Sequence, residues 1–283
     1  MKPPDFDYVA PTSIGGAIKA LESDSEARLL AGGQSLIPLL AFRMASPTLL
    51  VDLARVEGLD HITDHGDRLV IGAMTRQRRA ERDSQVAQRC PLLIEALRHV
   101  GHTQIRSQGT IGGSIAHADP AAELPGVVVA LGGRVHVAGP AGNRTIEAGD
   151  LFQGFFNTAM AECDILTAVE LPTSGPRNGW SVVEITRRPG DFALCGALCQ
   201  LQVGDSGHVV DAHLALIGVG DRPMRAVAVE QAILGGASPA EAAELAPEGL
   251  TPVNDVHASS DFRLHLTKVT SRRALTQALE RAL

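Results

Sequence analysis

The chain has 283 residues, of which 45% are hydrophobic and 20% charged, as expected for an ordinary globular protein. Its net charge is −7 and aromatic residues make up only 3%, so we expect no nucleic-acid partner. There is no apolar run of about 18 residues and no N-terminal signal peptide, so we expect no membrane span and a cytoplasmic location. The four cysteines are too scattered for a disulfide scaffold and are expected to be buried thiols.

Residues 1–56 are expected to form a first lobe in which helices alternate with short strands. Apolar residues recur at helical spacing over 12–23, which predicts an amphipathic helix. Short strands are expected at 28–30 and 48–53, and a helix at 35–44 lies between them.

Residues 57–175 are expected to form a second lobe that combines antiparallel hairpins with helices. The predicted elements are a hairpin over 59–73, helices over 76–89 and 92–100, a loop rich in Gly, Ser and Gln over 101–113, a helix over 121–132, a hairpin over 134–148 and a strand over 164–172.

A linker is predicted from Pro172 to Asn178, and residues 176–283 form a third part. Its predicted elements are three consecutive strands over 181–188, 193–203 and 209–219, followed by helices over 224–234, 239–245 and 261–283. The fold class is therefore α+β, and the last part contains a three-stranded antiparallel sheet with helices packed on one face.

Two glycine-containing turns are candidates for binding an anion. One runs from Leu30 to Leu36, directly after a strand and at the start of a helix, and the other runs from Gln108 to Ser114. Glycine lacks a Cβ, so a ligand can approach the backbone closely, and successive free N–H groups form an anion nest. Ser35, Thr110 and Ser114 add hydroxyl donors. These features indicate a pyrophosphate site.

The alternative is that both segments are only tight turns. The sequence has no G-x-G-x-x-G motif, so a Rossmann NAD site is unsupported, and the absence of any Gly-Lys pair excludes a Walker P-loop. A nucleotide bound here must be held in another way.

Five segments in order along the chain resemble the FAD-binding medium subunits of the molybdenum hydroxylase family, which includes carbon monoxide and xanthine dehydrogenases. They are AGGQSLIPLLAFRM followed by LVDL, TIGGSIAHADPAAELP, DILTAVELP, RRPGDFALCGA and FRLHLTKVTSRRAL. The resemblance implies a two-lobed FAD-binding domain, of the kind found in PCMH and vanillyl-alcohol-oxidase-like proteins, followed by a C-terminal α+β domain.

The resemblance also implies which residues contact FAD. Two segments would wrap the pyrophosphate: Leu29, Leu30, Ala31, Gly32, Gly33, Gln34, Ser35 and Leu36 in the first, and Thr110, Ile111, Gly112, Gly113 and Ser114 in the second. Further implied neighbours are Gly101 and Gln104 along the cofactor, Glu123 at the adenosine half or pyrophosphate, Ile165 and Arg187 near the flavin, and Phe192 beside the isoalloxazine ring.

The chain departs from the family pattern at two positions. Some relatives carry Tyr at the position of Phe192, so any hydrogen bond or gating by that hydroxyl is lost here. The C-terminal motif more often reads Tyr-Arg than Phe262-Arg263. The cysteine-rich insertion that holds a 4Fe–4S cluster in one branch of the family is absent, so we expect no cluster on this chain.

The resemblance implies an electron-transfer subunit. It would take electrons from a small 2Fe–2S subunit and pass them to an external acceptor, while a large molybdopterin-molybdenum subunit oxidises the substrate. The implied assembly is a dimer of heterotrimers. No side chain of this chain need then act as acid, base, nucleophile or metal ligand, because the cofactor supplies the redox chemistry.

Several other polar residues were considered for a role. His117 and Asp119 lack the third clustered ligand that a catalytic metal site needs. The run 76–79 is interpreted as a solvated helix face, with a docking surface as the alternative. Glu184 and Asp191 are further candidates for contact with flavin.

Two other functions compete with the electron-transfer subunit. A self-sufficient FAD-dependent oxidoreductase of the same wider fold would need an acid–base residue beside the ring, and the sequence marks none. A flavin-free binding or assembly module would show no flavin absorbance after FAD is added.

Overall fold

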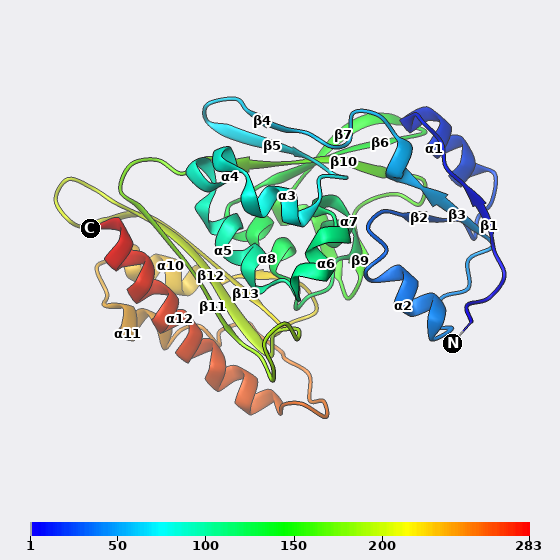
Figure 1. Cartoon of the computed structure of the whole chain (residues 1–283). Helices are drawn as coiled ribbons and strands as arrows, with labels where there is room; N and C mark the ends of the chain where they lie inside the picture. The colour runs from blue at the N-terminus through cyan, green and yellow to red at the C-terminus, as the bar shows by residue number, and fades with distance from the viewer. Residues whose placement is uncertain (1) are drawn as a thin grey trace.

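Three of the four β-sheets within residues 2–283 organise the molecule, and each of the three comes from one stretch of the chain (Figure 1). The computed structural model describes residues 2–283. Along the chain, helices and strands alternate first, then helices cover an antiparallel sheet, and a second antiparallel sheet with helices follows. The predicted α+β class is therefore confirmed.

The N-terminal sheet is parallel, with strand order β1-β3-β2. Its core contains Ala17, Leu21 and Val51, which are at most 5% exposed. β1 was not predicted, since its three residues are all exposed and carry no apolar alternation. The elements are β1 (Asp7–Val9), α1 (Ile14–Glu22), β2 (Arg28–Leu30), α2 (Leu36–Ala41), β3 (Leu49–Asp52) and η1 (Leu53–Arg55).

The central sheet has five antiparallel strands in the order β4-β5-β10-β6-β7. Both predicted hairpins are confirmed, and β10 pairs between them. Gly139 pairs with Gly142 across a two-residue turn, and Gly142 has a φ of 101° that favours glycine. The strands are β4 (Ile62–Asp64), β5 (Arg68–Gly72), β6 (Arg134–Gly139), β7 (Gly142–Glu147) and β10 (Ile165–Pro172), and the short elements α9 (Ala148–Leu151), β8 (Phe152–Gly154) and β9 (Asn157–Thr158) follow β7.

Helices α3 to α8 lie between the central and C-terminal sheets (Figure 1). The expected helix over 76–89 is broken at Asp83, whose side chain caps the second half by accepting from the Gln85 and Val86 amides at 2.8 and 3.2 Å. The segment 101–113, expected to be a loop, contains a helix and the start of another. The helices are α3 (Gln77–Arg82), α4 (Ser84–Arg89), α5 (Pro91–His99), α6 (Thr103–Gln108), α7 (Ile111–His117) and α8 (Glu123–Ala130).

Helix α8 connects the central region to the C-terminal part. All eight of its residues are buried, so it is apolar on every side, as expected for a core helix. It contacts α5 and α7 on one side and β12 and β13 on the other. The hydrophobic core that includes Val127 and Val128 also contains Leu198 and Ile217 of the C-terminal sheet.

The C-terminal sheet has four antiparallel strands, β11 to β14, and not the three that were predicted. The additional strand, β14, has two residues at the edge of the sheet, which is too short to produce an alternating pattern. Helix α12 packs along β11 and β12 and covers the outer face of the sheet (Figure 1). The elements are β11 (Asn178–Ile185), β12 (Cys195–Val203), β13 (Val209–Ile217), β14 (Met224–Arg225), α10 (Val227–Leu234), α11 (Pro239–Ala243) and α12 (Ser260–Ala282).

None of the helices within residues 2–283 is long and apolar enough to cross a membrane.

Candidate functional site

The turn between β2 and α2 presents unused backbone donors. Gly33 has a φ of 71°, which glycine adopts without strain, and this reverses the chain after the strand. The amides from Gly32 to Ser35 donate to no acceptor within residues 2–283, whereas the Ile37 amide bonds to the Gly33 carbonyl at 3.0 Å. All four residues with unused amides are half-buried, so their N–H groups form a nest that suits an anion.

The second glycine turn differs from the first because its amides are already used. Thr110 caps α7 by accepting from the Gly113 amide at 3.1 Å. The Ile111 and Gly112 amides bond to the carbonyls of Thr75 and Ala73, and the Ser114 amide bonds to the Thr110 carbonyl. This turn therefore offers no row of free amides. It offers the backbone of its glycines, which carry no side chain, and the hydroxyl of half-buried Ser114.

The two turns touch each other. A Cβ built on Gly32 would lie 2.8 Å from the Cα of Gly109 and would also meet the carbonyl oxygen of Gln108. A Cβ built on Gly113 would lie 3.3 Å from the Cβ of Ala31. The backbones approach this closely only because Gly32 and Gly113 lack side chains, so the two turns form one site.

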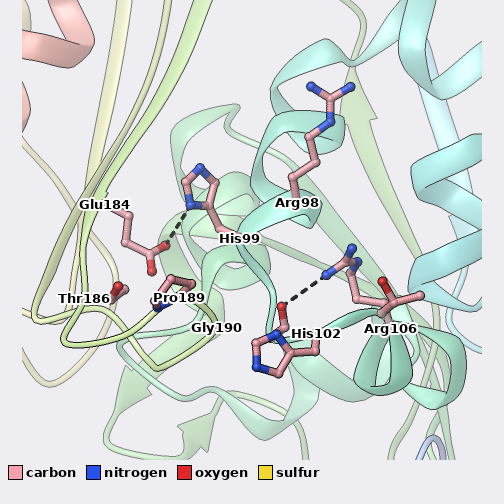
Figure 2. A pocket seen from close by; sticks show the side chains of 10 residues that line it. Arg98, His99, His102, Arg106, Glu184, Thr186, Pro189 and Gly190 are labelled. Carbon is pink, nitrogen blue, oxygen red and sulfur yellow. Dashed lines mark hydrogen bonds and ion pairs between the residues drawn. The ribbon is translucent and has the colours of Figure 1, made fainter.

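A cavity of about 340 Å³ lies at the other end of α6. Gly101 and Thr103 line it near the start of this helix, whereas Gln108 at its end contacts the first glycine turn. At 1.5 Å per residue, the six residues of α6 separate the two by about 9 Å. The cavity-lining residues are Arg98, His99, Gly101, His102, Thr103, Arg106, Glu184, Thr186, Pro189 and Gly190 (Figure 2).

Arg106 fixes the backbone at the entrance to α6. The guanidinium is buried and donates to both carboxylate oxygens of Glu81, at 3.0 and 3.2 Å. It also donates to the carbonyls of Val100 and Gly101, at 2.9 and 3.2 Å. Gly101 has a φ of 44°, so Arg106 stabilises a turn that glycine adopts most easily. Because its charge is paired with Glu81, Arg106 serves to position the turn.

Two buried carboxyl groups meet beside the cavity. The Glu184 side chain on β11 is 2% exposed, and its Oε2 has no hydrogen-bond partner within residues 2–283. Burial, together with nearby Glu123, raises the pKa of Glu184 to about 8. Burial also raises the pKa of Glu123, the first residue of α8, to about 7. At neutral pH Glu184 is therefore mainly protonated, so the two neighbouring carboxyl groups do not both carry a negative charge.

A histidine on α5 also lies close to Glu184. His99 Nδ1 lies 3.9 Å from Glu184 Oε2, and the two side chains point toward each other across the cavity wall (Figure 2). Burial lowers the pKa of His99, and the charge of Glu95 opposes this shift. The histidine side chain is 37% exposed, so it connects the buried carboxyl with solvent.

Comparison with known proteins identifies the family of this chain. Residues 4–174 match the family described as the FAD binding domain in molybdopterin dehydrogenase. The chain belongs to the FAD-binding medium subunits of the molybdenum hydroxylase family. Residues 180–278 match the CO dehydrogenase flavoprotein C-terminal domain, so the medium-subunit resemblance inferred from the five sequence segments is confirmed.

Similar proteins cover this medium subunit from end to end. The nicotine 6-hydroxylase medium subunit of Paenarthrobacter nicotinovorans is 38% identical over 98% of this chain and 99% of the relative. The structure of quinoline 2-oxidoreductase from Pseudomonas putida 86 superposes with a TM-score of 0.95 at 40% identity, covering 100% of this chain and 99% of that one. Carbon monoxide dehydrogenase from Hydrogenophaga pseudoflava superposes with a TM-score of 0.96 at 35% identity, covering 99% of each chain.

The medium subunit is thus an FAD-containing oxidoreductase subunit, and its own residues fit the cofactor. The unused amides of Gly32 to Ser35 match the need of a pyrophosphate for hydrogen-bond donors. Side chains line the cavity at the far end of α6. One of them is Glu184, whose buried Oε2 has no hydrogen-bond partner within residues 2–283. A dinucleotide can extend along α6 from the first feature to the second.

Other residues expected at the site differ in their exposure. Gln104 is exposed on α6, and Phe192 is 62% exposed in the loop between β11 and β12. That loop reaches the cavity, since a Cβ built on Gly190 would lie 2.8 Å from the His102 ring. Exposed Arg187 contacts a histidine of the segment before α12.

Outside the two glycine turns, Ile165 and Glu123 are the expected residues that are buried within residues 2–283. Ile165 is 0% exposed and its side chain belongs to the N-terminal core, so it offers no open surface to a cofactor in this structure. Glu123 lies near Arg106 and Glu184, two residues that line the cavity. No sequence pattern pointed to His99 or His102, and Glu184 was predicted only as a candidate for flavin contact.

The raised pKa of Glu184 predicts a pH-dependent effect of Glu184→Gln on stability. Its folded-state pKa of about 8 lies above the ordinary value of 4.5, so the folded protein holds this proton more tightly than the unfolded chain. The stabilisation from this group is fully present below the ordinary pKa and is lost as pH rises through about 8. In FAD-free protein, Glu184→Gln should raise the urea midpoint at about pH 9 and leave it unchanged at about pH 4. A stabilisation of the same size at both pH values would contradict this assignment.

Proposed function

We propose that this medium subunit is the electron-transfer component of a multi-subunit molybdenum hydroxylase. It takes electrons from a small 2Fe–2S subunit and passes them to an external acceptor, and substrate oxidation takes place on a large molybdopterin-molybdenum subunit. One observation carries this proposal. The two glycine turns contact each other at one end of α6, and a cavity lies at the other end of the same helix. The end-to-end similarity to the nicotine 6-hydroxylase medium subunit supports this proposal.

We infer an extended FAD with its pyrophosphate at the two turns. Leu29 to Leu36 supplies the free amides, and Thr110 to Ser114 supplies the close, hydroxyl-bearing surface. The flavin half follows α6 past Gly101 and Gln104 into the cavity. The location of Glu123 beside Glu184 supports a role at the flavin half, and not at the adenosine half that the resemblance also allowed.

The C-terminal part closes this site from the other side. Phe192 and Arg187 lie at the loop between β11 and β12, next to Pro189 and Gly190 of the cavity wall. We assign Phe192 to one side of the isoalloxazine ring, where it covers the flavin without offering a hydroxyl. Ile165, at the start of β10, would support the site by packing behind it.

When FAD is bound, it can accept electrons singly and release them in pairs. The chain's own residues bind and orient it: the first turn holds the phosphates, Arg106 fixes the turn at Gly101, and the loop around Phe192 limits access of water. We also propose three units, 1–56, 57–175 and 176–283, because each of the three larger sheets lies within one of these ranges. The proposed assembly is a dimer of heterotrimers in the cytoplasm.

Reconstitution of the purified chain tests this function. We expect one FAD per chain, with visible flavin absorbance that survives gel filtration. Addition of the proposed small and large subunits, with the substrate of the large subunit, should bleach this absorbance. A self-sufficient oxidoreductase is the second candidate function, because the acid–base groups Glu184 and His99 line the cavity. An FAD-loaded chain that oxidises a substrate without partners would favour this second function. A chain that binds no FAD would overturn both functions.

A further inference from the structure

The cavity wall carries an acid–base pair that electron transfer alone does not require. Glu184 is almost wholly buried, and its Oε2 is unpartnered within residues 2–283 although it lines the cavity. His99 lines the same cavity, with its Nδ1 3.9 Å from that oxygen and its ring partly in solvent. A carboxyl group with a purely structural role would have its hydrogen bonds satisfied. The free oxygen is therefore available to a ligand in the cavity (Figure 2).

No positive charge nearby forces Glu184 to ionise. Arg106 is committed to Glu81 and two carbonyls, so its charge is already paired. The Cys195 thiol on β12 is neutral, since burial raises its pKa to about 12. The other titratable and charged groups around Glu184 are Glu123 on α8, His99 on α5, His102 and Arg106 at α6, and Cys195 on β12, whereas the guanidinium of Arg98 points away from it (Figure 2).

We propose that Glu184 is the proton donor of the flavin site and that His99 carries protons to it from solvent. This inference rests on the proposed function, because it needs the isoalloxazine ring in the cavity. As two electrons enter the flavin from the partner's iron–sulfur clusters, the Glu184 O–H bond breaks and its proton passes to the ring. A second proton comes from solvent, so two electrons and two protons balance the reduction.

The site then returns to its starting state through His99. His99 takes a proton from solvent and passes it to the Glu184 carboxylate, so that His99 ends neutral and Glu184 ends protonated. The separation of 3.9 Å is too long for a direct hydrogen bond, so one water molecule or a small rotation of the ring completes the path. A buried acid whose pKa lies near neutral pH is well matched to this task.

The test is stopped-flow reduction of the FAD-loaded full chain by dithionite, followed by flavin absorbance. Reduction of wild-type protein should slow about tenfold per pH unit above about pH 8, where Glu184 loses its proton. Glu184→Gln should reduce the rate at neutral pH by about 100-fold or more and remove this pH dependence. Imidazole buffer, as an external acid, should restore part of the rate in proportion to its concentration.

Two further variants separate proton transfer from structural damage. Glu184→Asp keeps a carboxyl group and should retain the pH dependence at a lower rate. Glu248→Gln, which neutralises an exposed carboxylate outside the cavity wall, should match the wild type. If Glu184→Gln binds FAD and is reduced with the wild-type rate and pH profile, this inference is overturned while the proposed function stands. If wild-type protein binds no FAD, the proposed function itself fails.

Discussion

Gly32→Ala is expected to weaken FAD binding by about 10- to 100-fold, although it adds only a methyl group. The backbone of Gly32 is not in the left-handed region, so alanine itself is tolerated there. Its Cβ would, however, lie 2.8 Å from the Cα of Gly109 and close to the carbonyl oxygen of Gln108. Backbone atoms cannot rotate away, so the two turns must separate. Overpacking of this kind costs about 1–3 kcal/mol, and 1.4 kcal/mol corresponds to a tenfold change in affinity.

The measurement is a titration of FAD into the purified variants, followed by quenching of flavin fluorescence. Gly15→Ala is the matched control, since it lies in the same lobe on α1 and its added Cβ would meet no atom within 4 Å. It should leave FAD affinity unchanged and raise stability by at most about 1 kcal/mol through its helix propensity. Equal FAD affinity in the two variants would mean that the contact between the turns is not part of the FAD site.

The glycine turns could be predicted from sequence because the signal for each is local. A strand followed by Gly32-Gly33 and a helix already specifies a reversal with little side-chain cover. What could not be predicted is how each turn uses its amides. The amides of Ile111 and Gly112 bond to the carbonyls of Thr75 and Ala73. These partners lie more than 30 positions away in the sequence, and no local pattern records them.

The cavity was missed for the same physical reason. Glu184 appears in the sequence as one charged residue in an apolar strand, and His99 as the last residue of a helix. They approach because α5 packs against β11, which is a tertiary contact without a sequence period. Short edge strands such as β14 escape prediction because two residues cannot display an alternation. The long helix α12 was predicted close to its observed bounds, since its own apolar spacing repeats many times.

Arg263→Met is expected to destabilise the protein by about 1–3 kcal/mol, the usual cost of leaving a buried hydrogen-bond acceptor without its donor. Arg263 projects from α12 and is 5% exposed. It donates to the carbonyls of Leu194 and Gly218, at 2.6 and 2.8 Å, and to the carboxylate of Asp255 at 2.6 Å. Methionine fills similar space but leaves these acceptors without their donor. Urea unfolding followed by circular dichroism measures the loss.

Lys268→Met on the same helix supplies the control for this change. Lys268 pairs with Glu244 at 2.8 Å on the surface, and such exposed pairs contribute about 0–1 kcal/mol. Arg263→Lys should fall between the two, because lysine restores the charge but cannot reach three acceptors with one planar group. Leu194 lies two residues after Phe192, so Arg263 also anchors the end of the loop proposed to cover the flavin. We therefore expect Arg263→Met, and not Lys268→Met, to broaden the visible spectrum of bound FAD. Identical flavin spectra in the two variants would show that the loop keeps its position without Arg263.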